Sequence, residues 1–203
     1  SLKLSYPAQD DHDRNSSTDS RRLTTADSSL MFGAMETLDV AYADARPKVG
    51  KTDAERLASV YWNRNTTARE LPSERDRVFE LTATSGELTF LKVSNALEPL
   101  PVLETQNTML ETLADAQTCY RFPKLLPSTD QTQIIETELA DRRHFVHLLE
   151  EVPGISVGNG YQQSPELLRQ IGRMLAIVDR NLSESQTDDR AMIWDLRGAR
   201  TLI

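Results

Sequence analysis

The sequence predicts an α+β fold, in which an antiparallel sheet of five strands carries an inserted helix and is flanked by further helices. Three features support this prediction. The apolar residues change from a helical to an alternating, strand-like period at about Thr66. A Ser-Gly turn then joins two apolar runs, as in a β-hairpin. Beyond the break at Pro153 and Gly154, a strongly amphipathic helical pattern begins.

The first part of the chain divides into a polar leader and a helix. Residues 1–29 are rich in Ser, Asp and Thr, and we expect them to be flexible because they offer few groups to bury. A helical period runs from about Asp53 to Asn63. Thr52 and Glu55 have the spacing of a capping box, so we expect Thr52 to cap this helix.

The predicted sheet follows, with one helix inserted. Phe79 and Leu81 alternate with polar neighbours, a turn occupies residues 84–87, and the apolar run LTFLKVS comes next. Residues 99–115 have a helical period. Three short strand candidates come after this helix, with a turn at Asp141-Arg142-Arg143 between the last two; they lie at about 124–126, 133–138 and 144–150.

The last predicted element is a helix that begins at Ser164, as N-cap, and Pro165, in the first turn. Its apolar stripe comprises Leu167, Leu168, Ile171, Leu175 and Val178. We therefore divide the chain into a leader (1–29), a lobe (30–153) and a segment (154–203) that carries this connecting helix.

Composition limits the classes of function. The net charge is −8 and the pI is about 5.0, which argues against a broad nucleic-acid-binding surface. The sequence has neither the apolar run of a membrane helix nor the features of a signal peptide, so we expect a soluble, cytoplasmic protein. The single Cys119 cannot form an internal disulfide, and the three histidines lack the spacing of a zinc site.

Two stretches are candidates for phosphate binding. Residues 45–52 fit a relaxed Walker A pattern, with Ala45 in place of the leading glycine. That loop needs a buried strand before it and backbone N–H groups around the phosphates. The preceding residues make a poor central strand, and Pro47 lacks an N–H group. We therefore regard this stretch as the weaker candidate.

The second candidate is Lys92, which lies inside the apolar run LTFLKVSN. A buried ammonium group is unfavourable unless an anion meets it. In kinase-type phosphate sites, a loop between the first two strands covers the nucleotide, and a lysine on the third strand is held by a glutamate on the next helix. Lys92 and Glu104 occur in that order. Spacing alone leaves open the alternative of a lysine that faces solvent on an edge strand.

Six stretches, taken in order, carry a resemblance to a known family: LPSERDRVFEL, TFLKVSNALE, VLETQNTML, HFVHLLEEVPG, SPELLRQIGRMLAIVDRNL and MIWDLRGA. Together they resemble the N-terminal part of the aminoglycoside phosphotransferase-like kinases. The similarity extends to the hydroxylysine kinase branch and to phosphotransferase domains fused ahead of class III aminotransferases. It covers about Ala34 to Ala199.

The resemblance implies a protein-kinase-like N-terminal lobe that binds ATP with Mg²⁺. It assigns the loop of residues 72–76 to the phosphates, Lys92 to phosphate binding and Glu104 to an ion pair with Lys92. The adenine would lie against the connector after the last strand. The site residues that it implies are thus Lys92, Glu104, Ser73, Glu74, Arg75, Leu149, Glu150 and Glu151.

The sequence departs from the family pattern in three ways. The loop has no glycine, Val78 stands where relatives often carry Asn, and no H-G-D-x-x-x-x-N catalytic loop occurs. The catalytic Asp and the Mg²⁺ ligands are therefore expected from a second lobe.

We expect the nucleotide-binding lobe of a phosphotransferase that acts on the hydroxyl of a small amino alcohol or amino acid, without turnover by this chain alone. Its partners would be the nucleotide and the missing lobe or an aminotransferase domain. A non-catalytic kinase-like domain that binds a partner or a second copy of the chain is the alternative.

Overall fold

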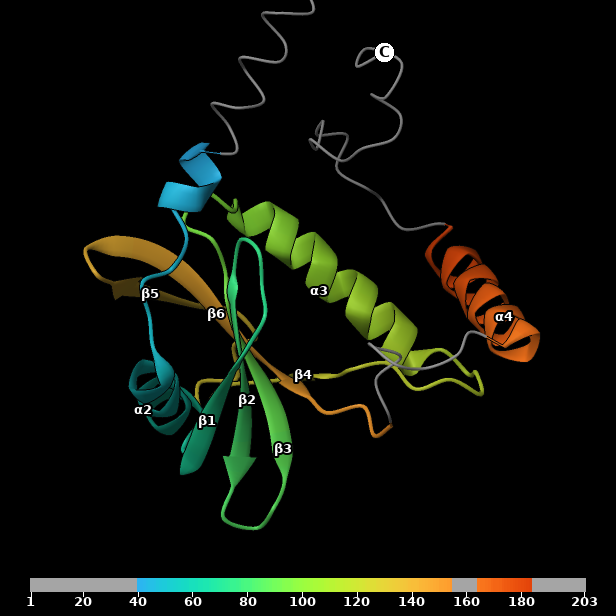
Figure 1. Cartoon of the computed structure of the whole chain (residues 1–203), viewed down its shortest axis with the longest axis horizontal. Coiled ribbons are helices and arrows are strands. Elements are labelled where there is room, and N and C mark those ends of the chain that lie inside the picture. The colour runs from blue at the N-terminus through green and yellow to red at the C-terminus, as the bar shows by residue number, and fades with distance from the viewer. Residues whose placement is uncertain (1–39, 155–163, 184–203) are drawn as a thin grey trace, which may run out of the picture.

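The computed structural model describes residues 40–154 and 164–183, with a short helical stretch at 40–44 (Figure 1). The predicted leader (1–29) and the C-terminal part of the predicted connecting segment lie outside the described residues. No helix in the described part of the chain is long and apolar enough to cross a membrane.

A six-stranded antiparallel sheet forms the centre of the structure (Figure 1). Its strands are β1 (Thr66–Leu71), β2 (Arg77–Ala83), β3 (Leu88–Val93), β4 (Leu125–Leu126), β5 (Ile135–Leu139) and β6 (Arg142–Glu150). The strand order is β1-β2-β3-β6-β4, and β5 also pairs with β6. The predicted α+β fold class is confirmed. The sheet has six strands instead of the predicted five, and the two-residue β4 lies within the strand candidate at 124–126.

Two tight turns fix the register of the hairpins. Gly86 lies in the β2–β3 turn with φ of +87°, a conformation that favours glycine. The β5–β6 turn consists of Ala140 and Asp141, whose φ angles are 49° and 63°, as in the two-residue turns that join twisted strands. The prediction that this turn extends over Arg142 and Arg143 was wrong, because both residues belong to β6.

The main core lies between one face of the sheet and helix α2 (Lys51–Trp62). Alternate residues of the central strands point into it, as the two-residue period of a strand requires. The largest fully buried side chains of this core are Phe79 and the leucines at 57 (in α2), 81, 91 and 148.

The predicted capping box of α2 was wrong. The N-cap is Gly50, and the Asp53 carboxylate accepts a hydrogen bond from the Gly50 N–H at 2.9 Å. Glu55, the predicted partner of Thr52, instead accepts a hydrogen bond from the Ala68 N–H at 2.9 Å. Glu55 thereby links α2 to β1.

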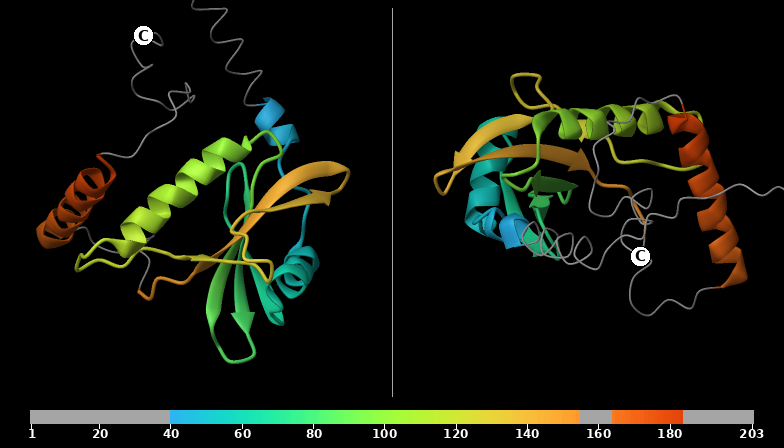
Figure 2. Two further views of the ribbon diagram at one scale, coloured as in Figure 1. Left: turned by 180° about the vertical axis from the view of Figure 1, so that it is seen from behind. Right: turned by 90° about the horizontal axis from the view of Figure 1, so that it is seen from above.

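Two further helices complete the described structure. Helix α3 (Leu100–Asp115) is the predicted inserted helix and follows β3. Helix α4 (Pro165–Leu182) begins as predicted, with the Ser164 hydroxyl accepting from the Leu167 N–H at 3.1 Å. Figures 1 and 2 place α4 beside the C-terminal end of α3, where the Tyr120 hydroxyl lies 3.2 Å from Oε1 of Gln170.

Candidate functional site

Lys92 lies on the face of the sheet opposite α2. Its neighbours Leu91 and Val93 are fully buried in the core, and the strand alternation turns Lys92 to the other side. Strand β3 lies between β2 and β6, so Lys92 is not on an edge strand. Its side chain is 26% exposed and lines a pocket of about 400 Å³.

The carboxylate that meets Lys92 is Asp76. The Lys92 Nζ lies 2.9 Å from the Asp76 Oδ2. The predicted ion pair between Lys92 and Glu104 was wrong: Glu104 is exposed on α3, and it is Gln106 of that helix that lines the pocket.

The predicted phosphate loop joins β1 to β2 and borders the same pocket. Ser73, Glu74 and Arg75 line it together with Asp76. Although the loop has no glycine, its backbone is held in place. The guanidinium group of Arg46 donates to the Ser73 carbonyl at 2.5 Å.

Asn95, two residues beyond β3, connects this loop to the sheet. Its backbone N–H donates to Asp76 Oδ1 at 2.9 Å. Its side-chain amide donates to the carbonyls of Tyr42 (2.8 Å) and Arg75 (3.2 Å), and its Oδ1 accepts from the Leu97 N–H at 3.0 Å. Sequence reasoning missed this residue, because an asparagine after a strand is also common in ordinary turns.

The competing Walker A stretch does not have the geometry of a phosphate loop. Residues 40–44, which precede it, are helical instead of extended. Arg46 is engaged with Ser73, and the Asp53 carboxylate accepts the N–H of the N-cap residue Gly50. A carboxylate at this helix N-terminus disfavours a second anion there.

His147 is a buried neighbour of Lys92 that sequence reasoning assigned no role. It is the cross-strand partner of Lys92 in the β3–β6 pairing and is 4% exposed. Burial, assisted by the charge of Lys92 and opposed by that of Asp76, lowers the pKa of His147 to about 4. His147 is therefore neutral at physiological pH, and its Nδ1 has no hydrogen-bond partner among the described residues.

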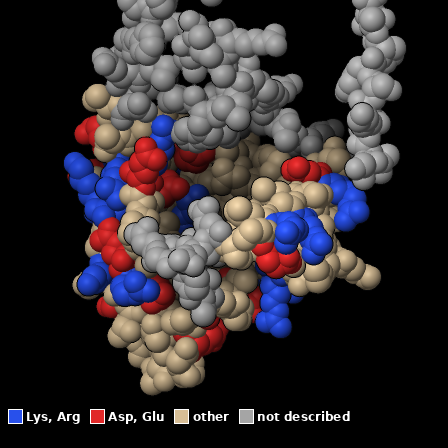
Figure 3. Space-filling view, turned by 45° about the vertical axis from the view of Figure 1, so that its right-hand side comes forward, with Lys and Arg blue, Asp and Glu red and all other residues tan. Residues whose placement is uncertain are grey.

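The pocket around Lys92 has a small negative formal charge. It is lined by two cationic residues, Lys92 and Arg75, and by three carboxylates, Glu74, Asp76 and Glu98. Figure 3 likewise shows basic and acidic groups interspersed on the face in view, without one broad basic area. A polyphosphate in this pocket would need additional positive charge from elsewhere.

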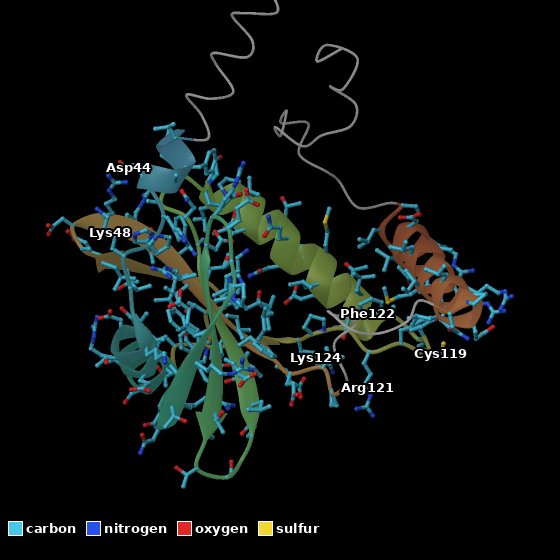
Figure 4. All side chains as sticks on the ribbon, in the orientation of Figure 1. Asp44, Lys48, Cys119, Arg121, Phe122 and Lys124 are labelled. Carbon is cyan, nitrogen blue, oxygen red and sulfur yellow. The ribbon has the colours of Figure 1, made fainter. Side chains whose placement is uncertain are left out.

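The predicted adenine contacts lie apart from this pocket. Leu149 is half-buried at the end of β6. The N–H of Glu150 donates to the Lys124 carbonyl at 2.8 Å and is thus already engaged. Glu150 and Glu151 border a second pocket of about 420 Å³ with Phe122 and Lys124, which lie on the loop leading to β4 (Figure 4).

The described residues contain no group of three or more His, Cys, Asp or Glu side chains that could hold a metal ion. The origin of the Mg²⁺ ligands in a second lobe therefore stays a prediction. Cys119, on the loop after α3, is exposed.

Solved kinases share this fold. A microcompartment-associated aminopropanol kinase superposes with a TM-score of 0.56 at 17% identity, covering 72% of this chain and 46% of that kinase. An amicoumacin kinase in complex with AMP-PNP, Ca²⁺ and Ami gives a TM-score of 0.58 at 13% identity, covering 72% of this chain and 45% of that kinase. The predicted resemblance is thus confirmed at the level of the fold.

The chain spans less than half the length of either kinase. No family model and no curated protein matches the sequence.

Proposed function

We propose that the chain is the nucleotide-binding lobe of an ATP-dependent phosphotransferase that acts in the cytoplasm. The observation that carries this proposal is the position of Lys92. It lies on a central strand, faces away from the core and lines a pocket whose other wall is the β1–β2 loop. This is the arrangement in which kinase-type sites hold nucleotide phosphates.

In this proposal each element of the pocket has a role toward the triphosphate. The Lys92 ammonium group donates hydrogen bonds to phosphate oxygens, and the loop of residues 72–76 covers them. When bound, Mg²⁺ neutralises part of the phosphate charge. The connector at Glu150 and Glu151 would meet the adenine, using groups other than the engaged N–H of Glu150.

The phosphoryl acceptor would be the hydroxyl of a small amino alcohol or amino acid. The fold neighbour that is an aminopropanol kinase supports this class. A second lobe or a fused aminotransferase domain would be the partner of this chain. The second lobe would supply the catalytic Asp, the Mg²⁺ ligands and most acceptor contacts. Without it, we expect weak nucleotide binding and no turnover.

Isothermal titration calorimetry with AMP-PNP and Mg²⁺ tests this proposal. We expect measurable binding by the full chain and its loss in Lys92→Ala. Lys51→Ala is the matched control, because Lys51 is an exposed lysine at the start of α2, on the opposite face of the sheet. Equal affinity in Lys92→Ala and in the unmodified chain would contradict the proposal.

A specific observation favours a second candidate function, that of a non-catalytic interaction domain. Helix α4 has no buried residue, and its leucines Leu168 and Leu175 are 51% and 53% exposed. An apolar stripe of this kind can mediate association with a partner or with a second copy. Light scattering after size exclusion tests it: a dimer that Leu168→Ser and Leu175→Ser convert to monomer would favour this candidate.

A further inference from the structure

We propose that Asp76, at the end of the phosphate loop, is the carboxylate that positions Lys92 for the nucleotide, in place of a glutamate on α3. This inference rests on the proposed function and identifies a positioning residue within it. It is carried by the Lys92–Asp76 contact of 2.9 Å and by the way in which Asp76 is itself held.

The Asp76 carboxylate has a partner at each oxygen. Oδ2 meets the Lys92 ammonium group, and Oδ1 accepts from the Asn95 N–H at 2.9 Å. The second bond fixes the carboxylate to the chain just beyond β3. The pairing of Val78 with Lys92 in the β2–β3 register keeps the end of the loop beside the lysine. Asp76 is therefore preorganised, and it holds Lys92 relative to the loop.

This arrangement leaves Lys92 able to bind phosphate. An ammonium group has three N–H donors, and one contact with Asp76 leaves the others for phosphate oxygens. A carboxylate near the lysine also keeps the side chain in one orientation before the nucleotide arrives, which reduces the entropy lost on binding. Because Asp76 belongs to the loop, its contact with Lys92 fixes the position of the lysine relative to the loop. Both would then contact the same phosphates.

Helix α3 contributes no charge to the Lys92 contact. Glu104 is exposed, and the residue of α3 that reaches the pocket, Gln106, is neutral. The position of Lys92 thus depends on the loop and on Asn95. Removal of the Glu104 charge should leave nucleotide affinity unchanged, whereas removal of the Asp76 charge should lower it.

The test compares AMP-PNP binding, with Mg²⁺, by the full chain and four variants. We expect Asp76→Asn to weaken binding roughly tenfold, as for loss of one charge-assisted contact, while Glu104→Gln stays within about twofold. Glu80→Gln is the matched control, because it removes an ion pair with Arg69 (2.5 Å) from the same sheet. Asp76→Ser, whose hydroxyl can still accept from Asn95, serves if Asp76→Asn fails to fold.

A double-mutant comparison separates positioning from a structural role. In a Lys92→Ala background, which should not bind the nucleotide, Asp76→Asn should have no further effect on the midpoint of urea denaturation, since Asp76 acts through Lys92. A purely structural role, through Asn95 and the loop, would persist in that background and would overturn the inference. Tighter binding by Asp76→Asn would also overturn it, because Asp76 would then compete with phosphate.

A second measurement distinguishes failure of this inference from failure of the proposed function. NMR of the nucleotide-free chain follows hydrogen exchange of the Lys92 ammonium group, which should be faster in Asp76→Asn and unchanged in Glu104→Gln. If the unmodified chain does not bind AMP-PNP, the proposed function fails and the positioning role fails with it. If it binds and Asp76→Asn binds equally well, only the positioning role fails.

Discussion

Asn95 is the residue on which the geometry of the β1–β2 loop depends most directly. It is 1% exposed, and its side chain makes three hydrogen bonds while its backbone N–H holds Asp76. Loss of the side chain would leave the carbonyls of Tyr42 and Arg75 without this donor, and buried unsatisfied groups are costly.

The Asn95→Ala variant should therefore lose about 2–3 kcal/mol of unfolding free energy. Urea denaturation at neutral pH measures this loss. Asn107→Leu is the matched control: Asn107 is also buried, but its amide has no partner among the described residues, so its replacement should be neutral or stabilising. Equal losses in both variants would contradict this account of Asn95.

The buried His147 predicts a pH-dependent stability. Its pKa is lowered to about 4, so between the ordinary value of 6.5 and that value the unfolded chain binds more protons than the folded chain. Stability should therefore fall as the pH falls through this window, by about 2 kcal/mol between pH 7.5 and pH 5 from this residue.

Urea denaturation of the unmodified chain and of His147→Leu at both pH values isolates this contribution. The acid-induced loss in His147→Leu should be smaller by about 2 kcal/mol, since the carboxylates titrate in both proteins. The same acid-induced loss in the two proteins would mean that His147 is not held neutral by burial.

At this scale, the sequence predicted the lysine but not its partner. Lys92 stood out because an ammonium group in an apolar run needs an anion. Glu104 was chosen from its order along the chain. Asp76 meets Lys92 because the β2–β3 register brings the end of one loop beside the next strand, which spacing alone does not reveal.

At the scale of the elements, α2 provides most of the helical contribution to the core. Leu57 is 1% exposed and belongs to the same cluster as Phe79 and Leu91 of the sheet. Leu57→Ala should destabilise the protein by about 2–5 kcal/mol, through lost burial and a cavity. Thermal and urea denaturation measure this effect.

Val60 offers the control on the same helix. It is 59% exposed, so Val60→Ala should change the unfolding free energy by no more than about 0.5 kcal/mol. A comparable loss in the two variants would mean that α2 does not pack on the sheet through the Leu57 face.

The helices and hairpins could be predicted largely from local patterns, but their ends and neighbours could not. Period alone identified α3 and α4, and the Ser-Pro start of α4 placed its cap. The cap of α2 was predicted at Thr52 because that spacing also fits a capping box, whereas Asp53 and Gly50 form the contact. The apolar stripe of α4 was also predicted from the sequence, but the pattern of residues does not identify a partner for its exposed leucines, Leu168 and Leu175.

At the scale of the whole molecule, the charge of the pocket around Lys92 predicts that this chain alone binds a nucleotide weakly. Three carboxylates face two cationic residues around it. Glu74→Gln removes one exposed carboxylate, and we expect it to strengthen AMP-PNP binding about threefold, consistent with a charge effect below 1 kcal/mol. Calorimetry at low and high salt tests whether the tighter binding is electrostatic, because the gain in affinity should then be smaller at high salt.

The kinase-like fold could be predicted from six collinear stretches, and solved kinases with this fold match 72% of the chain. The acceptor could not be predicted from the residues of the site. This chain spans 46% and 45% of those kinases, and the expected acceptor contacts belong to a second lobe.

The most direct test of the central claim is an NMR titration of the full chain with AMP-PNP and Mg²⁺. The account predicts that amide shifts concentrate at residues 72–76 and around Lys92 and Asn95, and that they disappear in Lys92→Ala. Shifts confined to other parts of the chain, or an unchanged pattern in Lys92→Ala, would contradict it.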